Sequence, residues 1–231
     1  MPKSFNQKLK ILYLMQAFME RTDREHPMSV PDLILYLDGY GISVERKTVY
    51  EDIETLRIFG MKIENRREKP SGYYLADRDF SFPELKILMD AVQSSRFITE
   101  RQSRELVRKL EHLTSISEAK RLQSQTSVLS GSKAVNREIY DSIQKICDAM
   151  ADNRQICFNY YEWDFSRELK PKRDGARYRV SPWKMIWNNE NYYLIGLDER
   201  NGIVKHYRVD KIMHVSIESQ KRNGEDIFRN F

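Results

Sequence analysis

The residue types best suited to holding an anion gather in the last third of this 231-residue chain. Strand alternation over residues 203–209 puts His206 and Arg208 on one face and Tyr207 on the other, with Lys211 just beyond the strand. Imidazole and cationic donors beside an aromatic ring suit a phosphate with a stacked base, because base–aromatic stacking contributes about 1–3 kcal/mol per base. We therefore expect a polyanion site formed by Ser181, Tyr192, His206, Arg208 and Lys211.

A structural role for the same residues is the alternative. Arg208 and Lys211 flank Asp210, so the two cations could form a surface ion pair with it. The tyrosines of the region could equally pack into a core; they are Tyr192, Tyr193 and Tyr207.

A second polar set lies in the first 80 residues, at the start of an expected helix and in a basic loop that follows it. Arg46 and Lys47 can bind guanine edges or phosphate, and Thr48 and Tyr50 can bind phosphate or a thymine methyl group. Ordinary solvent exposure is the alternative. The DNA-binding candidates are Arg46, Lys47, Thr48, Tyr50 and Glu51 in the helix, and Arg66, Arg67 and Lys69 in the loop.

Three helices must position this second set. Apolar periodicity predicts a first helix over residues 8–20. The capping box of Ser29 and Asp32 opens a second helix, which should end at Gly39 because glycine tolerates the left-handed conformation. Ser43 is the expected N-cap of the third helix.

A two-stranded wing follows the third helix. Strand-like runs at residues 61–65 and 73–76 flank the basic loop 66–72. Three helices followed by such a hairpin form the winged helix-turn-helix pattern, which inserts its third helix into a DNA major groove. We expect this domain over residues 1–80; a generic small α+β domain is the alternative.

The rest of the chain predicts a helical connector over residues 81–135 and a β domain with a leading helix over residues 136–231. Within the connector, Leu106, Leu110 and Leu113 predict an inward helix face, and the polar stretch 123–132 predicts an exposed linker. Short strands separated by tight turns indicate a small antiparallel β-barrel or a strongly curved sheet, so the fold class is α+β. The strand-like runs are 155–161, 178–186, 192–197, 203–209 and 213–217.

Composition fits a soluble, cytoplasmic protein made of two compact units. The chain is 40% hydrophobic and 32% charged, and it contains neither a membrane-length apolar run nor a signal-peptide core. Its net charge is +5, but residues 1–80 hold 13 basic and 13 acidic side chains. The densest positive stretch is residues 167–184, with seven basic and two acidic side chains, and a solvated surface is its simplest explanation.

The sequence does not favour an enzyme. Its four histidines are scattered, and it contains no P-loop, GxSxG, GxGxxG or HExxH pattern. Cys147 and Cys157 cannot form a disulfide framework or a cysteine-based zinc site. We therefore expect no metal and no cofactor.

Four runs carry a family likeness. Residues 180–183 (Val-Ser-Pro-Trp), 191–196 (Asn-Tyr-Tyr-Leu-Ile-Gly) and 205–212 (Lys-His-Tyr-Arg-Val-Asp-Lys-Ile) resemble the bacterial WYL-domain transcriptional regulators. Residues 47–53 resemble the recognition helix of that family. Each motif is modest alone, but their order and spacing are fairly specific and cover almost the whole chain.

The resemblance implies a DNA-binding winged helix-turn-helix, a helical connection and an Sm-like or SH3-like β-barrel WYL domain that senses a nucleotide or single-stranded nucleic acid. Tyr192 stands where the family motif has tryptophan, and Lys211 where many members have arginine, which makes phosphate recognition there single-point. The chain ends at Phe231, about where many relatives enter a C-terminal dimerisation domain, so it is expected to be a truncated or short member.

The expected function is therefore a DNA-binding transcriptional regulator modulated by a ligand. The alternative is an RNA-binding accessory protein that acts mainly through its β-barrel. One winged-helix module buries only about 600–1,000 Å² on DNA and discriminates poorly, which favours a homodimer on an inverted repeat with half-sites about 34 Å apart.

Overall fold

The computed structural model describes residues 9–125, 133–134, 136–165 and 168–229. These residues fall into two compact units. Unit 1 comes from Met1–Gln93 and Glu105–Leu129, and unit 2 from Ser94–Arg104 and Ser130–Phe231. The expected connector is thus not separated as a unit of its own; its residues are divided between the two.

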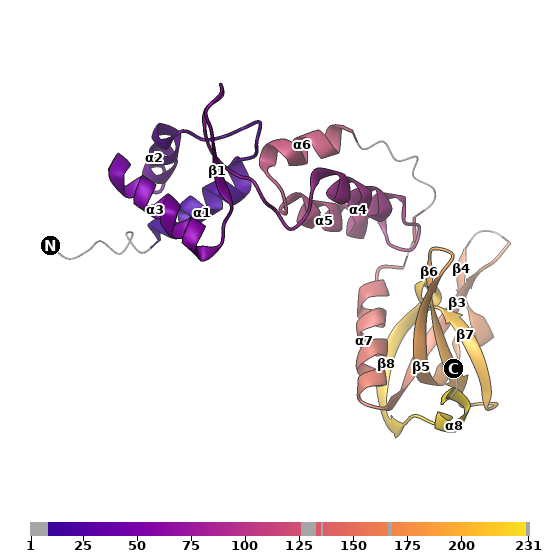
Figure 1. Ribbon diagram of the computed structural model, residues 1–231. Coiled ribbons are helices and arrows are strands. Elements are labelled where there is room, and N and C mark those ends of the chain that lie inside the picture. The colour runs from indigo at the N-terminus through magenta and orange to yellow at the C-terminus, as the bar shows by residue number, and fades with distance from the viewer. Residues whose placement is uncertain (1–8, 126–132, 135, 166–167, 230–231) are drawn as a thin grey trace. The chain divides into compact units, whose positions relative to one another are not determined.

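Unit 1 opens with the predicted winged helix-turn-helix arrangement (Figure 1). Phe18, Leu33, Ile53 and Ile63 come from four of its elements and share one buried core, which joins the helices to the wing. The wing strands pair antiparallel. The elements are α1 (Lys10–Arg21), α2 (Val30–Asp38), α3 (Arg46–Phe59), β1 (Ile63–Arg66) and β2 (Gly72–Leu75).

Helix boundaries follow the predicted caps in part. The Ser29 capping box is present, with the Asp32 amide donating to the Ser29 hydroxyl at 3.3 Å. The left-handed residue after α2 is Gly41 rather than Gly39. Ser43 is not an N-cap, because the chain runs on past the buried Ile42 and α3 begins only at Arg46.

Three helices follow the wing: α4 (Phe82–Ser94), α5 (Glu100–Glu111) and α6 (Ile116–Ser124). Their shared core consists of Leu85, Met89, Val107 and Leu122. No sequence pattern predicted α6, whose buried residues are only Ala119 and Leu122. Leu113, expected to face inward on a helix, lies beyond the end of α5 and is 40% exposed. Of the expected linker 123–132, residues 126–132 lie outside the described residues.

Unit 2 contains α7 (Ile139–Ala151) and an antiparallel sheet (Figure 1). β3 pairs with β4, β5 and β8, β5 pairs with β6, and β6 pairs with β7, which makes an open half-barrel that α7 covers along β8 and β3. All five strand-like runs are strands; the three-residue β4 was not predicted. The strands are β3 (Arg154–Trp163), β4 (Leu169–Pro171), β5 (Tyr178–Asn188), β6 (Asn191–Asp198), β7 (Ile203–Arg208) and β8 (Ile212–Lys221).

Short helical segments and an aromatic core complete unit 2. The 3₁₀ turns η2 (Lys172–Gly175) and η3 (Val209–Lys211) follow β4 and β7, and α8 (Glu225–Phe228) follows β8. Phe158 stacks on Tyr178 at 5.7 Å between ring centroids, and Tyr207 meets both rings edge-on. Tyr207 is therefore a core residue, which agrees with the alternative that the tyrosines of this region pack into a core.

Candidate DNA-binding face and anion pocket

The first turns of α3 carry an exposed polar surface. Arg46, Lys47 and Glu51 are exposed, with the Lys47 ammonium 4.0 Å from the Glu51 carboxylate one turn on. Tyr50 is 42% exposed and lies edge-on to Tyr73 of the wing, 6.3 Å between ring centroids. The opposite side is buried through Val49, Ile53 and Leu56, and Thr48 is half-buried.

The wing holds one of its three candidate cations, Arg66, against the segment between α1 and α2. The Arg66 guanidinium donates to the carbonyl of Arg24 at 2.7 Å and lies 3.6 Å from Glu25. Arg67 and Lys69, in contrast, are exposed at the tip between the strands. Only the tip residues are placed to reach outward without giving up a contact.

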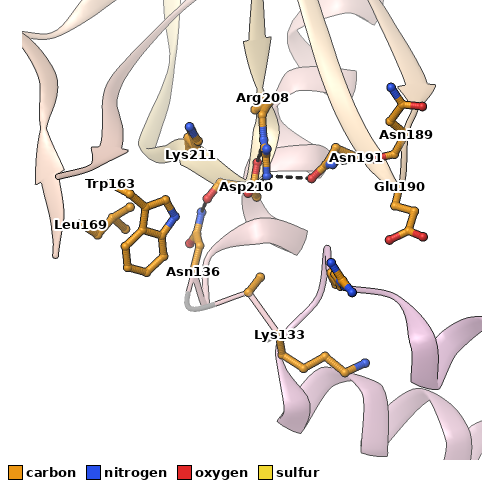
Figure 2. Close-up of a pocket in the computed structure, with 12 residues that line it drawn as sticks. Lys133, Asn136, Trp163, Leu169, Asn189, Glu190, Asn191, Arg208, Asp210 and Lys211 are labelled. Carbon is orange, nitrogen blue, oxygen red and sulfur yellow. Dashed lines mark hydrogen bonds and ion pairs between the residues drawn. The ribbon is translucent and has the colours of Figure 1, made fainter. Parts of the chain in front are cut away.

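Unit 2 contains a pocket of about 360 Å³ (Figure 2). It lies beside the end of β7 and η3. Four basic and two acidic side chains line it, so its charge is net positive. The lining residues are Arg96, Lys133, Ala134, Asn136, Trp163, Leu169, Asn189, Glu190, Asn191, Arg208, Asp210 and Lys211.

Arg208 is one of the lining residues, and hydrogen bonds to Asp210 and Asn191 orient its guanidinium (Figure 2). Its Nε and Nη2 donate to the two oxygens of Asp210 at 3.0 and 2.7 Å, and Nη2 also donates to Asn191 Oδ1 at 2.9 Å. Hydrogen bonding to Asp210 raises the pKa of the Arg208 guanidinium. Its Nη1 group makes no hydrogen bond with any described residue, so it remains available to a ligand.

The other three cations differ in how they are held. Lys133 donates to the Ser95 carbonyl and to the Ser103 hydroxyl, both at 2.8 Å, and burial lowers the pKa of its ammonium. Lys211 is half-buried and Arg96 is exposed, and the described residues offer neither of them a hydrogen bond or ion pair. Lys133 thus braces the pocket, while Lys211 and Arg96 are available to a ligand.

An apolar wall from the β3–β4 hairpin completes the pocket. Trp163 and Leu169 pair across the two strands, and Trp163 is 50% exposed (Figure 2). A half-exposed indole beside cationic donors can stack on a base. Sequence reasoning missed Trp163, which lies two residues beyond the strand-like run 155–161; β4, which pairs with this part of β3, was not predicted.

Three of the five predicted ligand residues do not line the pocket. Ser181 is fully buried, bonds the Glu199 carboxylate through its hydroxyl and accepts the Asn223 amide at 2.8 Å. The Tyr192 ring packs edge-on against Phe97 and Trp187. His206 is exposed on β7. Of the predicted set, only Arg208 and Lys211 come together in this pocket.

Several cations of the basic stretch 167–184 are paired with carboxylates or with backbone carbonyls. Lys170 lies 2.5 Å from Asp164 and Lys172 lies 2.8 Å from Glu162, and these hydrogen bonds raise the pKa of both ammonium groups. Arg177 donates to two backbone carbonyls. These cations therefore do not add up to a free basic patch; Arg167 lies outside the described residues.

The described part of the chain holds no group of three or more His, Cys, Asp or Glu side chains able to bind a metal ion. Among its helices, none combines the length and the apolar character needed to cross a bilayer.

Comparison with known proteins gives one family match, over residues 141–217, to the WYL domain. The curated proteins give no match. Among solved structures, proteasome accessory factor B/C (PafBC) of Arthrobacter aurescens matches with 16% identity and a TM-score of 0.32, covering 95% of this chain and 34% of that one. The chain thus spans about a third of the length of that structure.

Proposed function

Residues 141–217 are a WYL domain, and from this premise we propose that the protein is a DNA-binding transcription regulator whose operator affinity changes when that domain binds a nucleotide or single-stranded nucleic acid. The observation that carries the proposal is the exposed basic start of α3 on a winged helix-turn-helix module. The pocket of unit 2, with its available cations, supports the ligand-binding part of the proposal.

The DNA half of the proposal rests on where charge lies rather than on its sum. Residues 1–80 are neutral overall, so duplex binding requires their cations to share one face. Arg46 and Lys47 begin the helix that such modules place in the major groove, and Arg67 and Lys69 are exposed at the wing tip. The helix pair would read base edges or phosphate, and the tip would follow the adjacent backbone.

The experiment is selection of a preferred duplex from random DNA, followed by affinity measurements over a range of salt concentrations. Replacing Arg46 and Lys47 together with alanine should weaken binding at least tenfold. The salt dependence should fall by about one logarithmic unit per lost phosphate contact. Arg108 and Lys109, an exposed basic pair on α5, provide the matched control and should leave affinity unchanged on replacement.

Equal losses in the two double variants would exclude α3 as the reading helix. A protein that binds no duplex but binds single-stranded RNA through unit 2 would instead be the RNA-binding accessory protein of the alternative.

The ligand half rests on the contents of the pocket. Arg208 Nη1 and the Lys211 ammonium have no partner among the residues that the structure describes, and both suit phosphate oxygens. Trp163 offers a face for a base. The volume of about 360 Å³ lies within the range typical of small-ligand sites.

Continuity of the chain offers a route for coupling. The pocket residue Lys133 bonds Ser103 in α5, and α5 continues from unit 2 into unit 1. A ligand that fixes this start of α5 would bias the helix that leads into unit 1. A 100-fold change in operator affinity requires about 2.7 kcal/mol of such coupling.

A further inference from the structure

The segment between α1 and α2 contains a buried carboxylate, Asp23. Its Oδ1 accepts the backbone amides of Glu25 and His26, both at 2.9 Å, and His26 Nδ1 lies 2.9 Å from the same oxygen. An aspartate that accepts amides two and three residues on closes the backbone into a tight turn. The shape of this turn, residues 22–26, therefore depends on Asp23.

Both strands of the wing are attached to this segment. The Leu75 amide of β2 donates to the buried Thr22 hydroxyl at 3.0 Å. Met28 and Tyr73 exchange backbone hydrogen bonds at 2.8 and 2.9 Å in an antiparallel bridge. Arg66 of β1 donates to a carbonyl of the same segment. The position of the wing therefore follows that of the segment.

Ser115 anchors the turn to α6. It is fully buried and is the N-cap of α6, where its hydroxyl accepts the Glu118 amide at 3.1 Å. The same hydroxyl donates to Asp23 Oδ2 at 2.5 Å, between residues 92 positions apart in the sequence. Burial alone raises the pKa of Asp23, but the hydrogen bonds from Ser115 and His26 outweigh it and lower that pKa below its ordinary value. The carboxylate is thus charged at neutral pH, and hydrogen bonds to a charged group are stronger than neutral ones.

We propose that Ser115 and Asp23 are positioning residues for duplex DNA, because their hydrogen bond holds the turn and the turn holds the wing. Both residues are buried, so they act through the wing rather than by touching DNA. The exposed tip cations Arg67 and Lys69 are thereby directed at the phosphate backbone beside the bases that α3 reads. The role in DNA binding rests on the proposed function; the attachment of the wing to α6 does not.

The test compares Ser115→Ala with Ser81→Ala in the full chain. Ser81 directly precedes α4 and donates to Glu84 at 2.6 Å; its side chain bonds no part of the turn or the wing among the described residues. The first measurement is amide hydrogen exchange without DNA. Ser115→Ala should speed exchange of the Leu75 amide and of the turn at least tenfold, and Ser81→Ala should not. Urea unfolding checks that both variants remain folded.

The second measurement is the salt dependence of duplex affinity. Ser115→Ala should lower the slope of log affinity against log salt by about two, one for each tip cation that loses its phosphate. Arg67→Ala combined with Lys69→Ala should lower the slope equally, and adding Ser115→Ala to that pair should lower it no further. The preference for the selected sequence should remain, because α3 is intact.

Equal exchange of the Leu75 amide in Ser115→Ala and Ser81→Ala would overturn the proposal. So would a triple variant whose slope falls below that of the tip pair, since Ser115 would then act on something other than the wing. A wild type that binds no duplex would overturn the proposed function together with the role in DNA binding, and the exchange measurement would decide separately whether Ser115 holds the wing.

Discussion

Arg208 shows how a candidate ligand-binding cation can be both paired and available. Asp210 accepts two of its hydrogen bonds and Asn191 a third, yet Nη1 remains without a partner among the described residues. The pairing therefore orients the guanidinium without closing the pocket, which remains about 360 Å³ in volume. On this account Asp210 is a positioning residue whose negative charge opposes the ligand while its geometry assists binding.

Binding of a 5′-phosphorylated tetranucleotide, followed by quenching of Trp163 fluorescence, separates these roles. Arg208→Ala should weaken binding about tenfold or more, since a hydrogen bond to a charged group contributes about 1.5–3 kcal/mol. Arg179→Ala, an exposed cation outside the pocket, is the control and should bind as wild type does.

Two substitutions that replace a carboxylate with an uncharged amide test the role of Asp210 in the same binding measurement. Asp210→Asn and Glu190→Gln each remove one negative charge from the pocket. If Asp210 positions Arg208, Asp210→Asn should weaken binding and Glu190→Gln should not. Tighter binding in both variants would mean that net charge alone decides affinity.

Elements with strong periodicity or a strong cap could be predicted, and those held by distant contacts could not. The Ser29 capping box and the strand-like runs after Gln155 are local signals, and both were confirmed. β4 has three residues and exists through pairing with β3. Ser43 has the right residue type for an N-cap, but Glu45, with extended backbone, occupies that position and α3 begins at Arg46.

The residues of the candidate sites also divide into those that a local sequence pattern could predict and those that only distant contacts bring together. Arg208 and Lys211 are close in sequence and come together in one pocket. Arg96, Trp163 and Asn191 reach it from separate segments, and no local pattern links those segments. Ser181 was expected to donate a hydrogen bond to a ligand, but its hydroxyl bonds Glu199 and Asn223 instead. The sequence around a serine does not distinguish these two roles.

The wing depends on one glycine. Gly72 has φ +152°, and a Cβ there would overlap the Met28 carbonyl and lie 2.8 Å from the Ser29 amide nitrogen. Gly41→Ala, at φ +71° in open space, should lose about 1–2 kcal/mol of unfolding free energy through conformation alone. Gly72→Ala should lose about 1–3 kcal/mol more, because it adds a steric clash. Urea unfolding measures both, and equal losses would show that the wing absorbs the clash.

At the scale of the whole molecule, the two units are coupled only if the affinity for DNA differs between the empty and the occupied pocket. α5 passes from unit 2 into unit 1, and Lys133 attaches the pocket to its first turn. A ligand that binds equally well to both states would change nothing, however tightly it binds. If the proposed function is right, coupling rather than ligand affinity is the property on which regulation by this chain depends.

The most direct test of this account is the affinity of the full chain for its selected duplex, measured with and without saturating tetranucleotide, in wild type and in Arg208→Ala. We predict that the tetranucleotide changes the wild-type dissociation constant for duplex at least tenfold. The variant should bind duplex normally without tetranucleotide and show no such change when it is added. A wild-type affinity that stays the same when the pocket is full, or an equal change in Arg208→Ala, would contradict the account.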